Sequence, residues 1–257
     1  MKQTLTILFL LVSIFCAPAN PPCVTRDCAD GIKKIADCPD EGCAHPDKKT
    51  GKPHSFDEEL DKLKNIRSDN QQPVLRSIQF MKDLEKKPKS LTECGNRDEL
   101  KQLGEGQKIT VVAWALTARP GSQESCNCDL SHPADTDNHI VLVDPGVKNP
   151  TLAEDEIHSV TAEFTPRVRL DHPNFTRDAL NPLIDPHWKP PSKKDPKGKL
   201  LVRVTGLLMF DSKHLFEGAL KRDTNWEIHP VLKMEVCPEG ETCGADSDEN
   251  WKDLDNG

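Results

Sequence analysis

The stretch from Val202 to Val236 constrains the fold most, because it predicts two strands joined by a long connection. In the first strand, apolar and polar residues alternate with the period of two that is typical of a strand covering a core. Gly206 interrupts this pattern, where a bulge or sharp bend is expected. In the second strand, Glu227 and His229 share the face opposite Trp226. The pair therefore predicts a β core with titratable groups at one rim.

Three further strands precede this pair, at residues 108–118, 139–144 and 159–169. A helix-compatible segment, Asn174–Leu183, follows the third strand. Five strands with a helix between the third and the fourth are typical of the OB-fold, a small Greek-key barrel. We therefore predict a mainly β, five-stranded OB-fold-like barrel over residues 104–237.

The segments outside the barrel are assigned by composition. The N-terminal apolar run ends in an Ala-Pro-Ala cleavage site and is typical of a signal peptide, which predicts a secreted or periplasmic protein. Short helices are expected at residues 55–64, where the chain has capping-box form, and at 75–86. The predicted segments are a signal peptide (1–19), a Cys-rich irregular extension (20–54), a short helical segment packing on the barrel (55–103) and an acidic disordered tail (238–257).

Cysteine usage agrees with export. Of the ten cysteines, Cys16 leaves with the signal peptide, so nine remain. In an oxidising compartment most of them are expected to form disulfides, with one thiol left over, and this is favoured over a zinc knot in the extension. Cys126 and Cys128 are too close for an easy mutual bridge, so each is expected to pair elsewhere.

The overall charge limits the possible partners. The formal net charge is −8, one unit more negative once Lys2 is removed, and this acidity excludes an overall electrostatic footprint for nucleic acid or an anionic membrane. Aromatic residues are 5% with no tyrosine, so stacking platforms for bases or sugars are scarce. Apart from the N-terminal apolar run, the sequence has no hydrophobic run, so no transmembrane segment is predicted. The partner is thus an unidentified ligand, and the oligomeric state stays open.

One group of polar residues has the composition of a metal site. Asp135, Asp137 and His139 alternate along an extended segment and share one face. Asp211 and His214 lie where the fourth strand ends. Carboxylates and imidazole bind divalent ions such as Mn²⁺, Mg²⁺, Ca²⁺ or Zn²⁺. A divalent metal ion is therefore the candidate cofactor, and turn-capping aspartates are the alternative interpretation.

A second group could carry catalysis. Glu163 and Arg167 lie four residues apart on the third strand and could act as general base and anion clamp. The alternative is an exposed ion pair of little energetic consequence. Glu227 and His229 are placed to share a proton or a ligand, and Arg222 directly precedes their strand. The proline after His229 predicts a bulge or an edge there.

Several strings resemble segments of a group of exported bacterial proteins for which no activity is assigned. The group carries D-x-D-x-H-(I/L)-x-L, a Glu-containing third strand, V-x-V-T-G-x-x-F-D-x-x-H, E-(I/L)-H-P-V and L-K-N-R-x-D. The resemblance covers about residues 59–237 and implies the fold and export, with the same polar positions singled out. The corresponding strings here are D-T-D-N-H-I-V-L (135–142), A-E-F-T-P-R (162–167), V-R-V-T-G-L-L-M-F-D-S-K-H (202–214), W-E-I-H-P-V (226–231) and L-K-N-I-R-S-D (63–69).

The sequence therefore predicts an exported OB-fold-like binding domain with a polar rim site for an unidentified ligand or metal. One alternative is a metal-dependent hydrolase acting on a phosphodiester, by analogy with the OB-fold thermonucleases, whose own motifs are missing. In that case Asp135, Asp137 and Glu163 would be ligands and base, with Arg167 and Arg222 as clamps. A third possibility is a disulfide-stapled structural or envelope-interaction module. Convergence of at least three polar groups on one point would favour a site.

Overall fold

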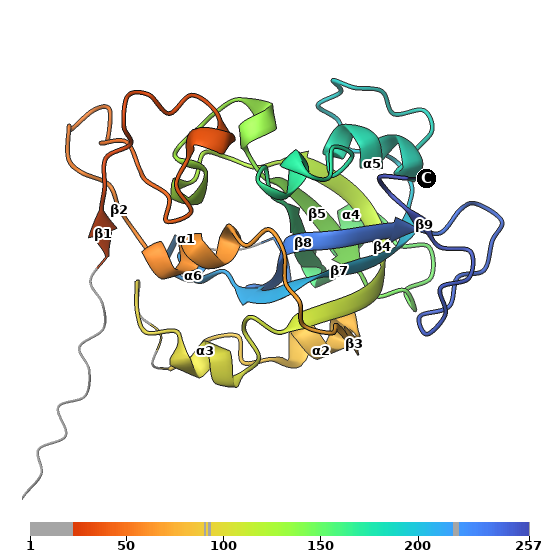
Figure 1. Cartoon of the computed structure of the whole chain (residues 1–257). Coiled ribbons are helices and arrows are strands. Elements are labelled where there is room, and N and C mark those ends of the chain that lie inside the picture. The colour runs from red at the N-terminus through yellow and green to blue at the C-terminus, as the bar shows by residue number, and fades with distance from the viewer. Residues whose placement is uncertain (1–22, 90, 92–93, 218–220, 257) are drawn as a thin grey trace, which may run out of the picture.

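Five long strands and one helix define the fold in the computed structural model, which describes residues 23–89, 91, 94–217 and 221–256. These elements are β4 (Lys108–Pro120), β5 (Asn138–Val143), β6 (Val160–Phe164), α5 (Arg177–Ile184), β7 (Leu200–Phe210) and β8 (Trp226–Val236). The strands pair in the order β4, β5, β6, β8, β7, and β7 pairs back with β4 to close a barrel (Figure 1). With α5 between the third and fourth strands, this is the predicted OB-fold-like barrel.

Alternation places one face of each strand in the core. On β6, Val160, Ala162 and Phe164 are fully buried inside the barrel. Glu163 and Thr165 alternate with them and so belong to the outer face, yet both are buried as well. Glu163 lies against His139 and His229, which come from the neighbouring strands β5 and β8. The outer face of β6 is therefore an interior surface.

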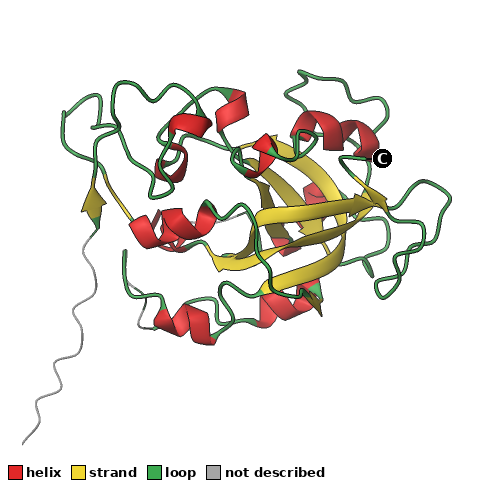
Figure 2. Ribbon diagram, in the orientation of Figure 1, coloured by secondary structure: helices red, strands yellow, loops and turns green. Residues whose placement is uncertain are grey.

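The helix α5 packs against strand β4 of the barrel. The Thr176 hydroxyl accepts a hydrogen bond from the Ala179 amide at 3.1 Å and caps the helix, which begins three residues later than predicted. The Asn181 side chain accepts a hydrogen bond from the Ala118 amide at 2.8 Å and donates one to the Ala118 carbonyl at 2.9 Å. These bonds fix α5 against β4, and Figure 2 shows helices lying around the strands.

The pairing of β7 with β8 contains the predicted bulge. Their register shifts on both sides of Gly206. A Cβ at this position would lie 2.3 Å from the Pro230 carbonyl oxygen and 2.5 Å from Ile228 Cγ2, so only glycine fits. Pro230 itself has no N–H to donate to the ladder. The two breaker residues thus face each other across the same irregularity.

Short elements surround the barrel and differ from the predicted helices. Helix α1 begins at Glu58 because Asp57 caps it, accepting a hydrogen bond from the Leu60 amide at 3.0 Å. The helix expected over 75–86 is shorter, because its first residues form a strand parallel to β4. The bounds are β1 (Val24–Thr25), β2 (Ser55–Phe56), α1 (Glu58–Lys64), β3 (Val74–Arg76), α2 (Ile78–Asp83), α3 (Asp98–Gln102), α4 (Leu152–Asp155), α6 (Ser212–Glu217) and β9 (Lys252–Asp253).

Disulfides hold the N-terminal extension on the barrel, as expected from the cysteine content. Cys126 was expected to pair, but it is free and buried, whereas Cys128 is oxidised. The predicted signal peptide at 1–19 lies outside the described residues. Within them, no helix combines the length and apolar character needed to cross a membrane. The disulfides are Cys23–Cys94, Cys28–Cys43, Cys38–Cys128 and Cys237–Cys243.

The acidic C-terminal segment was predicted to be disordered, and this prediction is wrong for residues 238–256. Strand β9 pairs with the end of β8. Trp251 is buried, with the Arg203 guanidinium 5.1 Å from its ring centroid. Arg203 also contacts Asp248 at 2.8 Å. Acidic composition suggested disorder, but one buried arginine and one tryptophan anchor the segment.

Replacement of Gly206 by Ala tests the bulge. We expect a loss of about 1–3 kcal/mol in the free energy of unfolding, because the added Cβ meets backbone that is held by the sheet. Gly31→Ala is the matched control, since no atom lies within 4 Å of its added Cβ. Urea unfolding of the oxidised protein measures both variants. Equal stability of the two would contradict the close approach of β7 and β8.

Candidate functional site

A row of three polar side chains crosses neighbouring strands on the outer face of the barrel. His139 on β5 pairs with Glu163 on β6 in antiparallel register. On the other side, β6 runs parallel to β8, with Ala162 paired to Ile228, so Glu163 lies next to His229. The Glu163 carboxylate accordingly lies 3.5 Å from His139 Nε2 and 3.0 Å from His229 Nδ1. The pairing of three strands thus assembles the row.

Groups from α1 and from the loop between β4 and β5 cover this row. Lys64, in the last turn of α1, forms an ion pair with Glu124 at 2.7 Å, and both side chains are buried. Asn127 donates a hydrogen bond from Nδ2 to Asp137 Oδ2 at 2.8 Å. Asn65 donates to the Cys126 carbonyl at 2.9 Å and so fixes the loop. Asp137 and Glu124 are thereby brought over the barrel wall.

A second set of charges extends the cluster towards α6. Arg222 bonds through Nη2 to Asp211 at 2.6 Å and through Nη1 to Glu227 at 2.8 Å. The His214 ring also contacts the Asp211 carboxylate. Glu227 in turn lies 3.2 Å from His229 Nδ1. Figure 1 shows α1 and α6 near the same end of the barrel. Contacts therefore run without a break from α6 to β6.

Burial and neighbouring charges separate the pKa values of these groups. Burial alone would lower the pKa of His229, but the Glu163 charge and the contacts with Glu163 and Glu227 raise it to about 10. Burial, followed by the charges of Glu124 and Glu163, raises the pKa of Asp137 to about 6. Burial opposes ionisation of Glu163, yet the charges of His139 and His229 hold its pKa well below the ordinary value. Without a bound cation, a proton on His229 balances part of the negative charge.

Several atoms of the cluster are buried without a hydrogen-bond partner. Asp137 Oδ1, Glu163 Oε2 and His229 Nε2 all lack one, although their residues are at most 4% exposed. His229 Nδ1 lies 3.0 Å from the Glu163 carboxylate and 3.2 Å from that of Glu227, and it carries at most one hydrogen for the two. Buried polar atoms without partners are rare and indicate a missing ligand, ion or water. One ligand atom from each of Asp137, Glu163 and His229 lies within 4.8 Å of the other two.

The structure brings most of the predicted site residues together but places two elsewhere. Asp135 accepts a hydrogen bond from the Ile35 amide at 2.8 Å and faces the N-terminal extension. Arg167 contacts Asp40 at 3.0 Å and the Cys38 carbonyl at 2.9 Å, so it anchors the same extension. Neither is part of the cluster, which corrects the prediction. The predicted residues that do form it are Asp137, His139, Glu163, Asp211, His214, Arg222, Glu227 and His229.

Sequence reasoning missed four members of the cluster, namely Lys64, Glu124, Cys126 and Asn127. Lys64 lies in the L-K-N string that entered the family resemblance, so that string held the only signal for it. Glu124 and Asn127 lie within two residues of Cys126, in a short segment whose sequence shows no strand or helix periodicity that would place their side chains. Lys64 and Glu124 meet only in the folded chain, because 60 positions separate them in the sequence.

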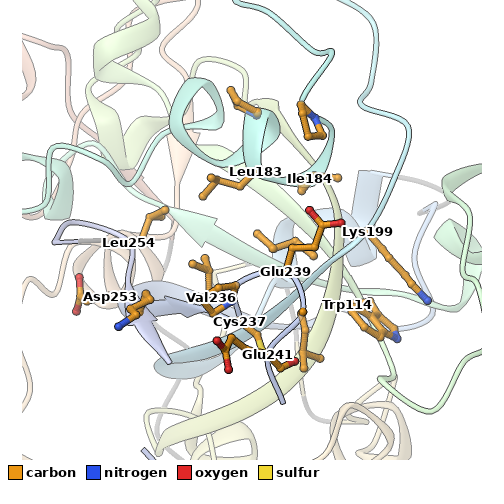
Figure 3. A pocket seen from close by; sticks show the side chains of 17 residues that line it. Trp114, Leu183, Ile184, Lys199, Val236, Cys237, Glu239, Glu241, Asp253 and Leu254 are labelled. Carbon is orange, nitrogen blue, oxygen red and sulfur yellow. Dashed lines mark hydrogen bonds between the residues drawn. The ribbon is translucent and has the colours of Figure 1, made fainter. Parts of the chain in front are cut away.

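Space beside the cluster is small. A pocket of about 90 Å³ is bordered by Lys64, Glu124 and Asp61 on one side and by Ser212 on the other. This volume suits an ion with a few waters rather than a drug-sized ligand, which needs roughly 300–1,000 Å³. A wider pocket of about 730 Å³ lies elsewhere, between the ends of α5, β7 and β8, and none of the predicted site residues lines it (Figure 3). The space that borders Lys64 and Glu124 therefore has the size of a small hydrated cation, and Asp137, Glu163 and His229 do not line it.

Comparisons of the chain with protein-family models, with curated proteins and with solved structures gave no significant match. The resemblance to exported bacterial proteins therefore stays a prediction.

Replacing Arg222 by Met tests whether the cluster acts as a buried charge network. We expect a loss of about 3–5 kcal/mol in the free energy of unfolding, because Asp211 and Glu227 would keep buried charges without their partner. Arg67→Met is the control, since Arg67 and Asp171 form an exposed pair whose loss should change stability by about 0.5 kcal/mol or less. Urea unfolding at neutral pH compares them. A cost for Arg222→Met as small as that of the control would show that the charges are solvated.

Proposed function

We propose that this chain is an exported OB-fold-like domain that binds a divalent metal ion through Asp137, Glu163 and His229. One observation carries the proposal. These three buried side chains converge, with one ligand atom of each within 4.8 Å of the others, and each has a buried atom without a hydrogen-bond partner. Convergence of three groups was the outcome that favours a site over dispersed turn and surface residues.

The donor set limits the class of ion. Two carboxylates and one imidazole suit Mn²⁺, Fe²⁺, Co²⁺ or Zn²⁺, whereas Ca²⁺ and Mg²⁺ prefer oxygen ligands alone. His139 is half-buried and lies 3.5 Å from the Glu163 carboxylate, so it is placed either to orient this ligand or to add a fourth donor. We therefore expect selectivity for a transition metal or zinc over calcium.

Electrostatics supports a cation here. Five buried carboxylates occupy the chain of contacts, whereas Lys64 and Arg222 supply permanent positive charges. Without an ion, a proton on His229 offsets part of the remaining negative charge. Isolated buried charge is costly unless it is paired or coordinates a metal. A divalent ion would offset this negative charge and would compete with the proton on His229. The carboxylates are Glu124, Asp137, Glu163, Asp211 and Glu227.

The hydrolase alternative has less support. Arg222, its remaining clamp, has both ends occupied by Asp211 and Glu227, and Arg167 lies away from the cluster. The adjoining pocket of about 90 Å³ does not admit a nucleotide-sized substrate. A purely structural module explains the disulfides but leaves the partnerless atoms of Asp137 and His229 without a role.

Metal binding tests the proposal directly. The oxidised mature protein is stripped with a chelator and titrated with Zn²⁺, Mn²⁺ and Ca²⁺ by calorimetry, alongside elemental analysis of the protein as purified. Glu163→Gln and His229→Asn should weaken Zn²⁺ binding by more than the roughly 10- to 100-fold that loss of an outer-shell partner costs. Glu235→Gln and His172→Asn are matched controls, because these residues form ion pairs with Arg203 and Asp255 elsewhere.

Stability provides a second readout that does not depend on the variants folding normally. An ion at 100 times its dissociation constant should stabilise the wild-type protein by about 2.7 kcal/mol. Circular dichroism confirms that each variant is folded at the temperature of titration. A folded wild-type protein that neither binds nor gains stability from any of the three ions would overturn the proposal and leave a closed, protonated ion network.

A further inference from the structure

Cys126 is the one described cysteine outside a disulfide, although it lies among oxidised cysteines. It occupies the 3₁₀ helix Ser125–Asn127, and two residues later Cys128 is joined to Cys38. Asn65 donates a hydrogen bond to its carbonyl, and the Ser125 carbonyl accepts one from the Cys43 amide at 3.0 Å. The backbone that carries this thiol is therefore held on both sides and cannot adjust freely.

The surroundings of this thiol are charged. Buried cysteines usually behave as small apolar side chains. Cys126 is 1% exposed, but its Sγ lies 3.6 Å from Glu124 Oε2, and the charges that act on it come from Glu124, Lys64 and Asp137. Burial, and then the Glu124 charge, raises the pKa of the thiol well above its ordinary value. The sulfur is thus a thiol until a positive ion arrives.

Glu124, Cys126 and Asp137 satisfy the same distance relation as the first cluster. One ligand atom of each lies within 4.8 Å of the other two. A second observation points to a ligand at this place, because Asp137 Oδ1 and Asn127 Oδ1 are buried without a hydrogen-bond partner and both residues are 1% exposed. Asp137 belongs to both groups, and a carboxylate has two oxygens with which to contact two ions.

A third group of residues at similar distances consists of cysteines alone and has a different explanation. Cys28, Cys43 and Cys128 also lie close together, but all three are oxidised in disulfides and offer no thiolate. Only the group around Cys126 combines a free sulfur with carboxylates among the described residues.

We propose that Glu124, Cys126 and Asp137 form a second metal site, next to the first and sharing the Asp137 carboxylate, for a thiophilic divalent ion of the zinc class. The proposal rests on the proposed function for the role of Asp137 as a shared ligand. Thiolate ligands select zinc-like ions over calcium and magnesium. The sulfur therefore adds a specificity that the carboxylates and His229 alone do not provide.

Binding at this site exchanges a proton for the metal. The S–H bond of Cys126 breaks, the sulfur keeps the electron pair and forms the metal–sulfur bond, and one proton leaves to solvent. No oxidant or reductant is needed.

Cobalt is the probe that separates the two sites, because Co²⁺ bound to a thiolate has an intense near-ultraviolet charge-transfer band that oxygen and nitrogen ligands do not produce. The oxidised, chelator-stripped mature protein is titrated with Co²⁺ and followed by absorption. We expect a charge-transfer band together with weaker visible bands, and about two ions per chain. Cys126→Ser and Cys126→Ala should both lose the charge-transfer band, keep the visible bands and bind about one ion.

Two further variants and a count of free thiols distinguish failure of the second site from failure of both sites. Glu124→Gln should lower the Co²⁺ affinity measured from the charge-transfer band at least tenfold. The control Glu235→Gln should leave this affinity unchanged. Visible bands without a charge-transfer band in the wild-type protein would overturn the second site and leave the first intact. No Co²⁺ signal of any kind would overturn both. A denatured protein with no free thiol would also refute the second site, because Cys126 would then be oxidised.

Discussion

The parallel pairing of β6 with β8 is the contact on which the rest of the molecule depends. It joins the first three strands of the barrel to the last two, and its register puts Glu163 beside His229 on the outer face. Because Ala162 and Ile228 fill the core on the opposite face, neither polar side chain can turn inward without exchanging places with the core. The charges are therefore fixed on the outside of the barrel, and their environment depends on what covers them.

That cover comes from α1 and the loop between β4 and β5. The N-terminal extension has little core of its own and is joined to this loop by a disulfide. Its elements are short, and an extension of this kind gains too little from apolar burial to offset the entropy of ordering. The Cys38–Cys128 disulfide, which joins residues 90 positions apart, removes roughly 4–5 kcal/mol of chain entropy from the unfolded state in the loop-closure account. Arg167 adds contacts to Asp40 and to the Cys38 carbonyl. Oxidation thus contributes to the burial of the cluster as well as to the fold.

The barrel could be predicted from the sequence because its information is local. Alternation in β6, β7 and β8 sets strand type, and Gly206 with Pro230 sets the bulge. The position of α5 then chooses the topology. The covering layer could not be predicted in the same way, since Lys64 reaches Glu124 across 60 positions. The prediction of a disordered acidic tail was wrong for a related reason. Acidic composition does not reveal the buried Arg203 that holds this segment.

The same distinction explains which site residues were identified. Glu163, Glu227 and His229 follow from strand periodicity and pairing, and they lie together as periodicity requires. Asp135 and Asp137 differ by two positions and share a face in an extended chain, but a 3₁₀ helix over Pro133–Asp135 turns the first towards Ile35. Local irregularity therefore decided which carboxylate entered the cluster.

A buried group of carboxylates does not improve the stability of a fold by itself. Apolar residues of similar volume often stabilise such a position as well or better, because they avoid the loss of hydration. The barrel already has a continuous apolar core on the inner face of the same strands, so its folding does not require Asp137, Glu163 and His229 on the outer face. Ligand atoms of these three residues converge, and each residue has a buried atom without a hydrogen-bond partner. A ligand that supplies positive charge explains this arrangement better than a contribution to stability does.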